Sequence, residues 1–236
     1  MRDDILAILC PDIHGRDFWK IILEKYDGSV PVIFLGDYLD PYFDEGITPE
    51  KALNNFKEIF EFKKKWGDKV ILLIGNHDMS YYDKKFRCCR FSYENSEWYN
   101  NFLNENIKDF TMCYEINNGE KKILFTHAGI HPEWIAQNYL EPKYDAKYIN
   151  ELFEKDKNYF NIYGYYRGGY PFDTGSPIWA DIREFNTSNC KNYDENIIQI
   201  VGHTQLVKDF IKINNVYCID SRTVFVLTKN NEIEEY

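Results

Sequence analysis

The chain contains five short runs of apolar residues, and each run ends in a cluster of polar and loop-forming residues. The runs cover 5–10, 32–35, 70–74, 123–125 and 197–201. Continuous apolar runs of this length are typical of strands that are buried on both faces. The pattern therefore predicts five core strands whose carboxyl ends each open into a polar loop.

Helical patterns lie between the first strands. Thr48 and the proline after it place a capping side chain and a first-turn proline ahead of apolar residues at helical spacing. A helix over 17–26 is expected to be capped by Asp17, and weaker helices are predicted at about 96–106 and 145–155. The alternation of strand and helix over the first third of the chain predicts an α/β protein.

After about residue 112 the pattern changes to shorter strands, which are predicted at 112–116, 123–125, 197–201, 210–213, 216–219 and 224–227. Two sheets, or one large mixed sheet, follow from this pattern. There is no internal repeat and no clear domain boundary, so a single domain over 1–236 is expected. Residues 157–195 are rich in Tyr, and this aromatic content favours an ordered loop region over a linker.

Composition and charge limit the classes of partner. The chain has 236 residues, of which 44% are hydrophobic, and 28 Lys and Arg against 38 Asp and Glu give a formal net charge of −10. This charge argues against binding to duplex nucleic acid, although bound cations can still hold a phosphate group locally. No apolar run reaches the roughly 18 residues of a membrane span, and no signal peptide is evident. The six cysteines show no repeated metal-type spacing, so a reducing compartment, the cytoplasm, is expected.

All five strand ends carry Asp, His or Asn, and four of the five histidines lie there. Ligands of open α/β sheets bind at the carboxyl ends of strands. The mixture of imidazole and carboxylate suits first-row divalent metals, and there are more such groups than one ion needs. We therefore predict two divalent metal ions, which together can bind a phosphoryl group and a hydroxide for in-line attack. The residues concerned are Asp12, His14, Asp37, Asn76, His77, His127 and His203.

Five motifs, D-x-H-G, G-D-x-x-D, G-N-H-D, H-A-G and G-H-T, follow one another between Asp12 and about Ser221. In content and order they resemble the motifs of the calcineurin-like metallophosphoesterases. Residues 36–40, 126–130 and 178–181 are most similar to the phosphoprotein phosphatase branch, which includes Ser/Thr protein phosphatases and symmetrical bis(nucleosyl)tetraphosphate hydrolases. The resemblance implies a four-layer α/β/β/α sandwich of two mixed sheets flanked by helices.

The resemblance also implies roles for individual residues. Asp12 and His14 would bind the first metal, Asp37 would bridge both metals, and Asn76, His127 and His203 would bind the second. His77 would protonate the leaving alkoxide, and Asp40 would orient it. Mn²⁺ is the expected metal, with Fe and Zn²⁺ compatible with the same ligands.

The sequence departs from the family pattern at two places. Gln205 replaces a second histidine of the last motif, which implies one nitrogen ligand fewer for the first metal. Pro41 and Tyr42 stand where eukaryotic protein phosphatases have Arg-Gly, and that Arg contacts the substrate phosphate. Arg183 is the first candidate to replace it, and a structural ion pair is the alternative reading of that residue. Weaker candidates are Arg16, Arg87, Arg90 and Arg167, and His131 is interpreted as a loop residue.

These observations predict a dinuclear metal-dependent phosphoesterase that hydrolyses phosphomonoesters and resembles Ser/Thr protein phosphatases. Its substrate would be a phosphorylated protein or a small phosphate ester. A metal-bound hydroxide would attack phosphorus, and His77 would supply the proton. The alternative is a symmetrical dinucleoside tetraphosphate hydrolase, which the missing Arg after Asp40 favours. A non-catalytic interaction module on the same fold is a further alternative, against which the presence of both Asp37 and His77 argues.

Overall fold

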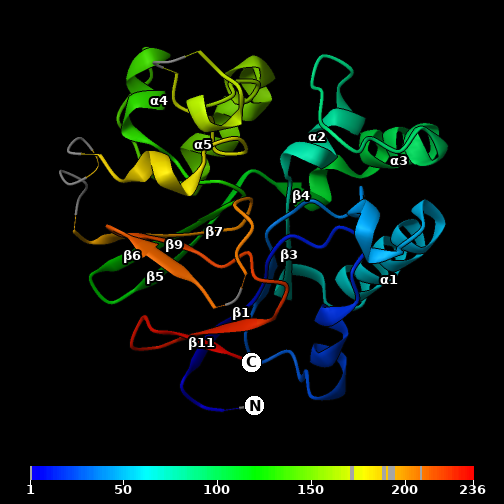
Figure 1. Cartoon of the computed structure of the whole chain (residues 1–236). Helices are drawn as coiled ribbons and strands as arrows, with labels where there is room; N and C mark the ends of the chain where they lie inside the picture. The colour runs from blue at the N-terminus through cyan, green and yellow to red at the C-terminus, as the bar shows by residue number, and fades with distance from the viewer. Residues whose placement is uncertain (1, 171–172, 188–189, 191–194, 208) are drawn as a thin grey trace. The chain divides into compact units, whose positions relative to one another are not determined.

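The computed structural model describes residues 2–170, 173–187, 190, 195–207 and 209–236. The contacts within the chain divide it into two compact units. The first unit comprises Met1–Thr111 and Arg222–Tyr236, and the second comprises Met112–Ser221 (Figure 1). The single domain expected over 1–236 stays a prediction.

The first unit is built on a six-stranded mixed sheet with the order β11-β10-β1-β2-β3-β4. Strands β1 to β4 are parallel, whereas β10 and β11 are added antiparallel at the β1 edge. The strands are β1 (Ile5–Cys10), β2 (Val32–Phe34), β3 (Val70–Leu73), β4 (Phe110–Thr111), β10 (Phe225–Thr228) and β11 (Ile233–Glu235). Four of them confirm predicted apolar runs, and the short β4 and β11 were not predicted.

Three α-helices belong to this unit: α1 (Pro49–Trp66), α2 (Asn76–Tyr82) and α3 (Tyr93–Asn106). The predicted start of α1 is confirmed, because Thr48 Oγ1 accepts a hydrogen bond from Lys51 N at 3.2 Å. One face of α1 is buried, and α1 contacts both β3 and α3 (Figure 1). The 3₁₀ segments of the unit are Phe18–Glu24, Phe43–Glu45, Gly67–Lys69 and Ile107–Asp109.

The α-helix expected over 17–26 is wrong in type. The segment is the 3₁₀ helix Phe18–Glu24, and the Asp17 side chain makes no capping hydrogen bond. Trp19 and Ile22, three residues apart, are the buried pair, whereas Ile21 is 48% exposed. Because residues three apart align in a 3₁₀ helix, this tighter winding buries the two side chains that the core accepts.

The second unit contains a five-stranded mixed sheet with the order β5-β6-β7-β9-β8. Strands β6, β7 and β9 are parallel, and β5 and β8 form antiparallel edges. The strands are β5 (Cys113–Asn118), β6 (Lys121–Thr126), β7 (Ile197–Val201), β8 (Ile211–Ile213) and β9 (Val216–Cys218). Helices α4 (Pro132–Gln137) and α5 (Ala146–Lys155) belong to this unit. The helix predicted at 145–155 is confirmed as α5, and Asp145 caps it.

The Tyr-rich region at 157–195 is ordered where the structure describes it. It forms the 3₁₀ segments Lys157–Phe160, Tyr165–Arg167 and Ile182–Phe185. Phe160 and Phe185 are fully buried, so this part of the chain contributes to the core of the second unit. Residues 171–172, 188–189 and 191–194 of the region lie outside the described residues.

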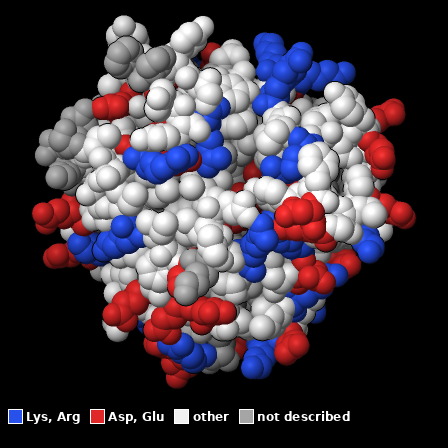
Figure 2. Space-filling model, in the orientation of Figure 1, with Lys and Arg blue, Asp and Glu red and all other residues white. Residues whose placement is uncertain are grey.

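The α/β class is confirmed, and the chain forms two mixed sheets with helices beside them. The layer order of the expected sandwich stays a prediction. Among the described residues, no helix combines the length and apolar character needed to cross a membrane. On the face drawn in Figure 2, described Lys and Arg residues are interspersed with Asp and Glu residues.

Candidate active site

The carboxyl ends of β1, β2 and β3 bring together most of the residues that the sequence singled out. Asp12 and His14 follow β1, Asp37 follows β2, and Asn76 and His77 begin α2 after β3. All five are at most 4% exposed. Because these strands are parallel neighbours, their loops lie at one edge of the sheet, as the sequence predicted.

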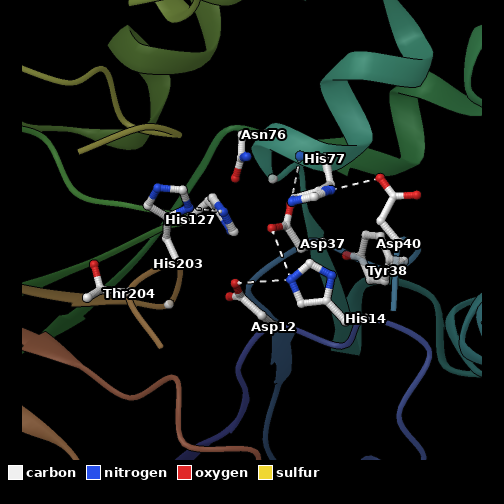
Figure 3. A network of polar contacts seen from close by, with 12 residues as sticks. Asp12, His14, Asp37, Tyr38, Asp40, Asn76, His77, His127, His203 and Thr204 are labelled. Atoms are coloured by element: carbon white, nitrogen blue, oxygen red, sulfur yellow. Dashed lines mark hydrogen bonds and ion pairs between the residues drawn. The ribbon is translucent and has the colours of Figure 1, made fainter. Parts of the chain in front are cut away.

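His14 is oriented for cation binding. Its Nδ1 lies 2.8 Å from the carbonyl oxygen of Leu39, so Nδ1–H donates and Nε2 keeps its lone pair. That Nε2 faces the carboxylates of Asp37 at 3.6 Å and Asp12 at 3.9 Å (Figure 3). Burial lowers the pKa of His14, which keeps the ring neutral. A lone pair facing two carboxylates is a donor set that a divalent ion satisfies, so the residues present fit the metal that the family pattern implies.

Asp37 is also held by the start of α2. Its Oδ1 accepts a hydrogen bond from His77 N at 2.9 Å. The close packing of Asp37 against the start of α2 requires a glycine at position 75, because a Cβ there would lie 2.1 Å from Asp37 Oδ1. The G-N-H-D motif therefore carries a packing requirement in addition to its three polar side chains.

Asp78 is a positioning residue that the sequence reasoning missed. Its buried carboxylate accepts hydrogen bonds from Asp37 N at 2.8 Å, Tyr38 N at 3.1 Å, Gly75 N at 2.9 Å and the Tyr99 hydroxyl at 3.0 Å. These bonds join the loop after β2 to the loop after β3. The signal was available, because Asp78 is the last residue of the G-N-H-D motif.

His77 and Asp40 form the expected pair. His77 Nδ1 lies 2.7 Å from Asp40 Oδ2 (Figure 3). The other oxygen of Asp40 accepts hydrogen bonds from Ser92 N at 3.2 Å and from the Tyr81 hydroxyl. Burial lowers the pKa of His77, but the charge of Asp37 and the bond to Asp40 outweigh it and raise the pKa to about 10. Ring nitrogens of His14 and His77 and a carboxylate oxygen of Asp37 lie within 4.8 Å of one another.

Arg90 contacts His14, His77 and Asp40. Its guanidinium lies 3.8 Å from the ring centroid of Tyr42, and its Nε donates to the carbonyl oxygen of Asp40 at 3.2 Å. Its Nη2 lies 3.4 Å from Nε2 of both His14 and His77. The sequence analysis ranked Arg90 among the weaker candidates, since its distance from the motifs along the chain gives no sign of this position.

In the second unit, His127 and His203 form a pair at the ends of β6 and β7. His127 Nε2 lies 3.1 Å from His203 Nδ1, and both side chains are buried. Arg167 Nη2 donates to the carbonyl oxygen of His203 at 3.2 Å. His131, interpreted from the sequence as a loop residue, caps α4 by accepting a hydrogen bond from Glu133 N at 3.1 Å.

Arg183 is engaged in an ion pair in the second unit. Its Nε lies 2.7 Å from Asp181 Oδ1 and its Nη2 lies 2.9 Å from Oδ2, while 57% of its side chain is exposed. Asp181 also pairs with Arg167 at 3.1 Å. This is the structural alternative that the sequence left open for Arg183.

Buried Asp, His and Asn side chains at the ends of parallel strands, together with a His–Asp pair, are typical of metal-dependent hydrolases. A model of the calcineurin-like phosphoesterase family matches residues 6–216, and the chain belongs to that family. A relative, serine/threonine-protein phosphatase ppe1 of Schizosaccharomyces pombe, is 31% identical over 137 residues. The match covers 53% of this chain and 39% of that protein, so the chain matches about two fifths of the relative's length.

Two solved structures show the same fold. A protein serine/threonine phosphatase from Saccharomyces cerevisiae with similarity to human phosphatase PP5 matches with a TM-score of 0.63 and 14% identity. That match covers 99% of this chain and 80% of the other. A proposed diadenosine tetraphosphatase matches with a TM-score of 0.55 and 13% identity, over 100% of this chain and 94% of the other.

Proposed function

We propose that this chain is a metal-dependent phosphoesterase that hydrolyses phosphomonoesters in the manner of a Ser/Thr protein phosphatase. The observation that carries the proposal is the first-unit cluster, in which the His77–Asp40 pair adjoins the His14 and Asp37 donors. Family membership and the similarity to a serine/threonine-protein phosphatase support it. The substrate would be a phosphorylated protein or a small phosphate ester.

The proposed cofactor is a pair of divalent ions, with Mn²⁺ as the first candidate and Fe or Zn²⁺ compatible. By family resemblance, Asp12, His14 and Asp37 would bind one ion, and Asp37, Asn76, His127 and His203 would bind the other. When bound, such ions supply positive charge to the phosphate oxygens and lower the pKa of water enough to provide the nucleophile near neutral pH.

His77 is the proposed proton donor to the leaving alkoxide. Asp40 holds Nδ1, which leaves Nε2 as the atom that gives up the proton, and the Tyr81 and Ser92 bonds to Asp40 fix the carboxylate in turn. The negative charge of Asp40 stabilises the imidazolium form, so the proton is present when the substrate binds.

Arg90 is the proposed phosphate contact in place of the arginine missing at Pro41. Its guanidinium is fixed by the Tyr42 ring and the Asp40 carbonyl, and Nη2 lies beside both histidines. Arg183, by contrast, already uses two of its nitrogens on Asp181. A planar guanidinium held in this way can bind two phosphate oxygens at once.

The test of the function is a rate comparison on a phosphoserine peptide, an alkyl phosphate and diadenosine tetraphosphate, with Mn²⁺ added. We expect the first two to be hydrolysed faster. A marked preference for diadenosine tetraphosphate would assign the alternative function, and no hydrolysis of any of the three by protein shown to bind Mn²⁺ would overturn the proposal.

The role of His77 has its own test. His77→Ala should retain Mn²⁺ binding and lose about 10²–10⁴-fold in turnover of an alkyl phosphate, the usual contribution of a positioned general acid. An aryl phosphate, whose leaving group needs little protonation, should be affected much less. An equal loss on both substrates would contradict the acid role.

A further inference from the structure

Cys88 and Cys89 follow one another in the chain between α2 and α3 of the first unit. Both are free thiols; Cys89 is exposed and Cys88 is partly buried, whereas the other four cysteines are buried. The partly buried thiol of Cys88 therefore neighbours the solvent-accessible thiol of Cys89 along the chain. Nothing in the proposed hydrolysis uses either residue.

The two thiols lie close to His77. One donor atom from each of His77, Cys88 and Cys89 lies within 4.8 Å of the other two. In a tetrahedral zinc site, the usual bond lengths place sulfur and nitrogen donors about 3.5–3.8 Å apart. The three donors can therefore reach one ion with small side-chain movements, and a water completes the fourth position, as in three-ligand zinc sites.

The surroundings of the three donors are those of a metal site. The bond from His77 Nδ1 to Asp40 at 2.7 Å fixes the ring and leaves Nε2 for a metal, an arrangement that recurs behind zinc-binding histidines. Cys88 Sγ accepts a hydrogen bond from Asn76 Nδ2 at 3.0 Å, but the bond with Cys89 and burial raise the pKa of the Cys88 thiol, so this sulfur keeps its proton until a cation replaces it. Hydrogen bonds with Cys88 and His77 lower the pKa of the Cys89 thiol. Arg90 Nη1 donates to Cys89 Sγ at 3.6 Å and its Nη2 lies 3.4 Å from His77 Nε2, so a cation bound here would displace the guanidinium from both donors.

We propose that His77, Cys88 and Cys89 form a separate binding site for a thiophilic divalent ion such as Zn²⁺. This site uses sulfur, whereas the Asp12, His14 and Asp37 donors are oxygen and nitrogen, so the sulfur site favours thiophilic ions more strongly and Mn²⁺ less. Binding releases one proton from each thiol that becomes a thiolate ligand and the Nε2 proton of His77, which must leave before that nitrogen can bind a cation. It also occupies His77 Nε2, so the ion acts as an inhibitor of proton donation. This last consequence rests on the proposed function, whereas the binding itself does not.

Binding is tested with Cd²⁺ on the full chain, because thiolate coordination gives a charge-transfer absorption that oxygen and nitrogen ligands do not. We expect the band to saturate at one thiolate-bound Cd²⁺ per chain. Cys88→Ala and Cys89→Ala should each weaken this binding by at least about tenfold. Cys113→Ala, at a buried cysteine of β5, is the matched control and should behave as the wild type, with circular dichroism confirming that each variant is folded.

The absence of a thiolate band in the wild type, or an unchanged band in both Cys88→Ala and Cys89→Ala, would overturn the site. An unchanged Cd²⁺ affinity in His77→Ala would also overturn it, because the proposal requires the imidazole as a ligand.

Inhibition is tested separately with Zn²⁺ added to the Mn²⁺-loaded protein. Cys89→Ala should keep its turnover within about twofold of the wild type and need at least about tenfold more Zn²⁺ for half inhibition. Equal inhibition of both proteins would overturn the link to catalysis. An inactive protein that still shows the Cd²⁺ band would count against the proposed function and leave the metal site supported.

Discussion

Several of the proposed active-site residues have backbone conformations that L-amino acids rarely adopt. His14, Asp37, Asp40 and Arg90 have φ angles of 45°, 54°, 60° and 58°, in the left-handed region. Each such residue costs on the order of 1–3 kcal/mol and persists only where its surroundings fix it. At Asp37 the bond from its backbone N–H to Asp78 is one such constraint. His14, Asp37 and Asp40 lie in the loops after β1 and β2, and Arg90 lies between α2 and α3, so backbone strain occurs in each of these segments of the proposed site.

Arg90 gives a prediction at this scale. Arg90→Ala should lower kcat/KM for a phosphomonoester by about 10–100-fold, because hydrogen bonds to a charged group contribute about 1.5–3 kcal/mol. Most of the loss should appear as a higher KM. Arg90→Lys should recover part of it, since an ammonium supplies the charge without the two-pronged geometry. Steady-state kinetics on a phosphopeptide and on an alkyl phosphate measure both effects.

Arg183→Ala is the comparison for Arg90. Because Arg183 is exposed and bonded to Asp181, we expect its removal to change kcat/KM by less than about threefold. A large loss in Arg183→Ala with none in Arg90→Ala would reverse the assignment and restore the candidate that the sequence favoured.

The sequence predicted which polar residues lie at the strand ends, but it did not predict which residues from other parts of the chain pack around them. Asp12, His14, Asp37 and Asn76 were recognisable because each follows an apolar run that must end at one edge of a parallel sheet. Arg90 was not ranked highly, since the irregular chain between α2 and α3 has no periodicity from which its path could be inferred.

At the scale of elements, two capping residues had different outcomes. Thr48 and Asp17 both precede apolar residues at helical spacing, but only Thr48 caps an α-helix. Helix α1 buries a continuous stripe along its 18 residues, whereas Phe18–Glu24 buries only Trp19 and Ile22. A cap contributes about 1 kcal/mol, so the extent of the buried face, which depends on the rest of the fold, decides the type of helix.

The Thr48 cap can be measured. Thr48→Ala removes the bond to Lys51 N and should lower the free energy of unfolding by about 1 kcal/mol in urea denaturation. Thr48→Ser keeps a hydroxyl at the same place and should retain most of this energy. If Thr48→Ser lowered the free energy of unfolding as much as Thr48→Ala, the methyl group of Thr48 rather than its hydrogen bond would account for the stabilisation.

At the scale of the whole molecule, the sequence left open whether the strands form two sheets or one. The deciding feature is a long-range one: β10 pairs with β1, although more than 200 residues separate them along the chain. Local patterns predict where a strand forms, and they carry no information about which partner it finds at that distance. The structure resolves the alternatives in favour of two sheets.

Glu184 should make the stability of the molecule depend on pH. It is 7% exposed, and its Oε1 has no hydrogen-bond partner among the described residues, so burial raises its pKa from 4.5 to about 7. The folded protein therefore holds a proton between pH 4.5 and 7 that the unfolded chain has lost. Since the folded state binds more protons, this group's contribution to stability is complete below pH 4.5 and falls as the pH rises to 7.

The size of this effect is up to about 3 kcal/mol, the free energy that corresponds to a rise in the pKa of Glu184 from 4.5 to about 7. Glu184→Gln should remove this fall in the free energy of unfolding. Measured by urea denaturation, the stability of the variant relative to the wild type should therefore increase between pH 4.5 and 7.5. The exposed Glu154→Gln is the matched control and should follow the wild type. Parallel curves for wild type and Glu184→Gln would contradict the assigned pKa.

Metal removal should lower the stability of the whole chain. The Asp12 and Asp37 carboxylates are buried on either side of His14 Nε2, and a divalent ion supplies the positive charge that this arrangement lacks. An ion that binds only the folded state at about 100 times its Kd stabilises it by about 2.7 kcal/mol, which corresponds to about 5–10 °C in Tm for a chain of this length. A chelator should therefore lower Tm by about that amount, and added Mn²⁺ should restore it.

Two variants separate metal binding from proton donation in the same thermal experiment. Asp37→Asn removes the proposed bridging ligand and should lose most of the Mn²⁺-dependent rise in Tm. His77→Ala should keep that rise, because His77 is assigned to the leaving group and is absent from the Mn²⁺ ligands. A full Mn²⁺-dependent rise in Asp37→Asn would show that the ion stabilises the chain elsewhere. Loss of this rise in His77→Ala would show that the imidazole itself binds Mn²⁺, which would contradict the assignment of His77 as proton donor only.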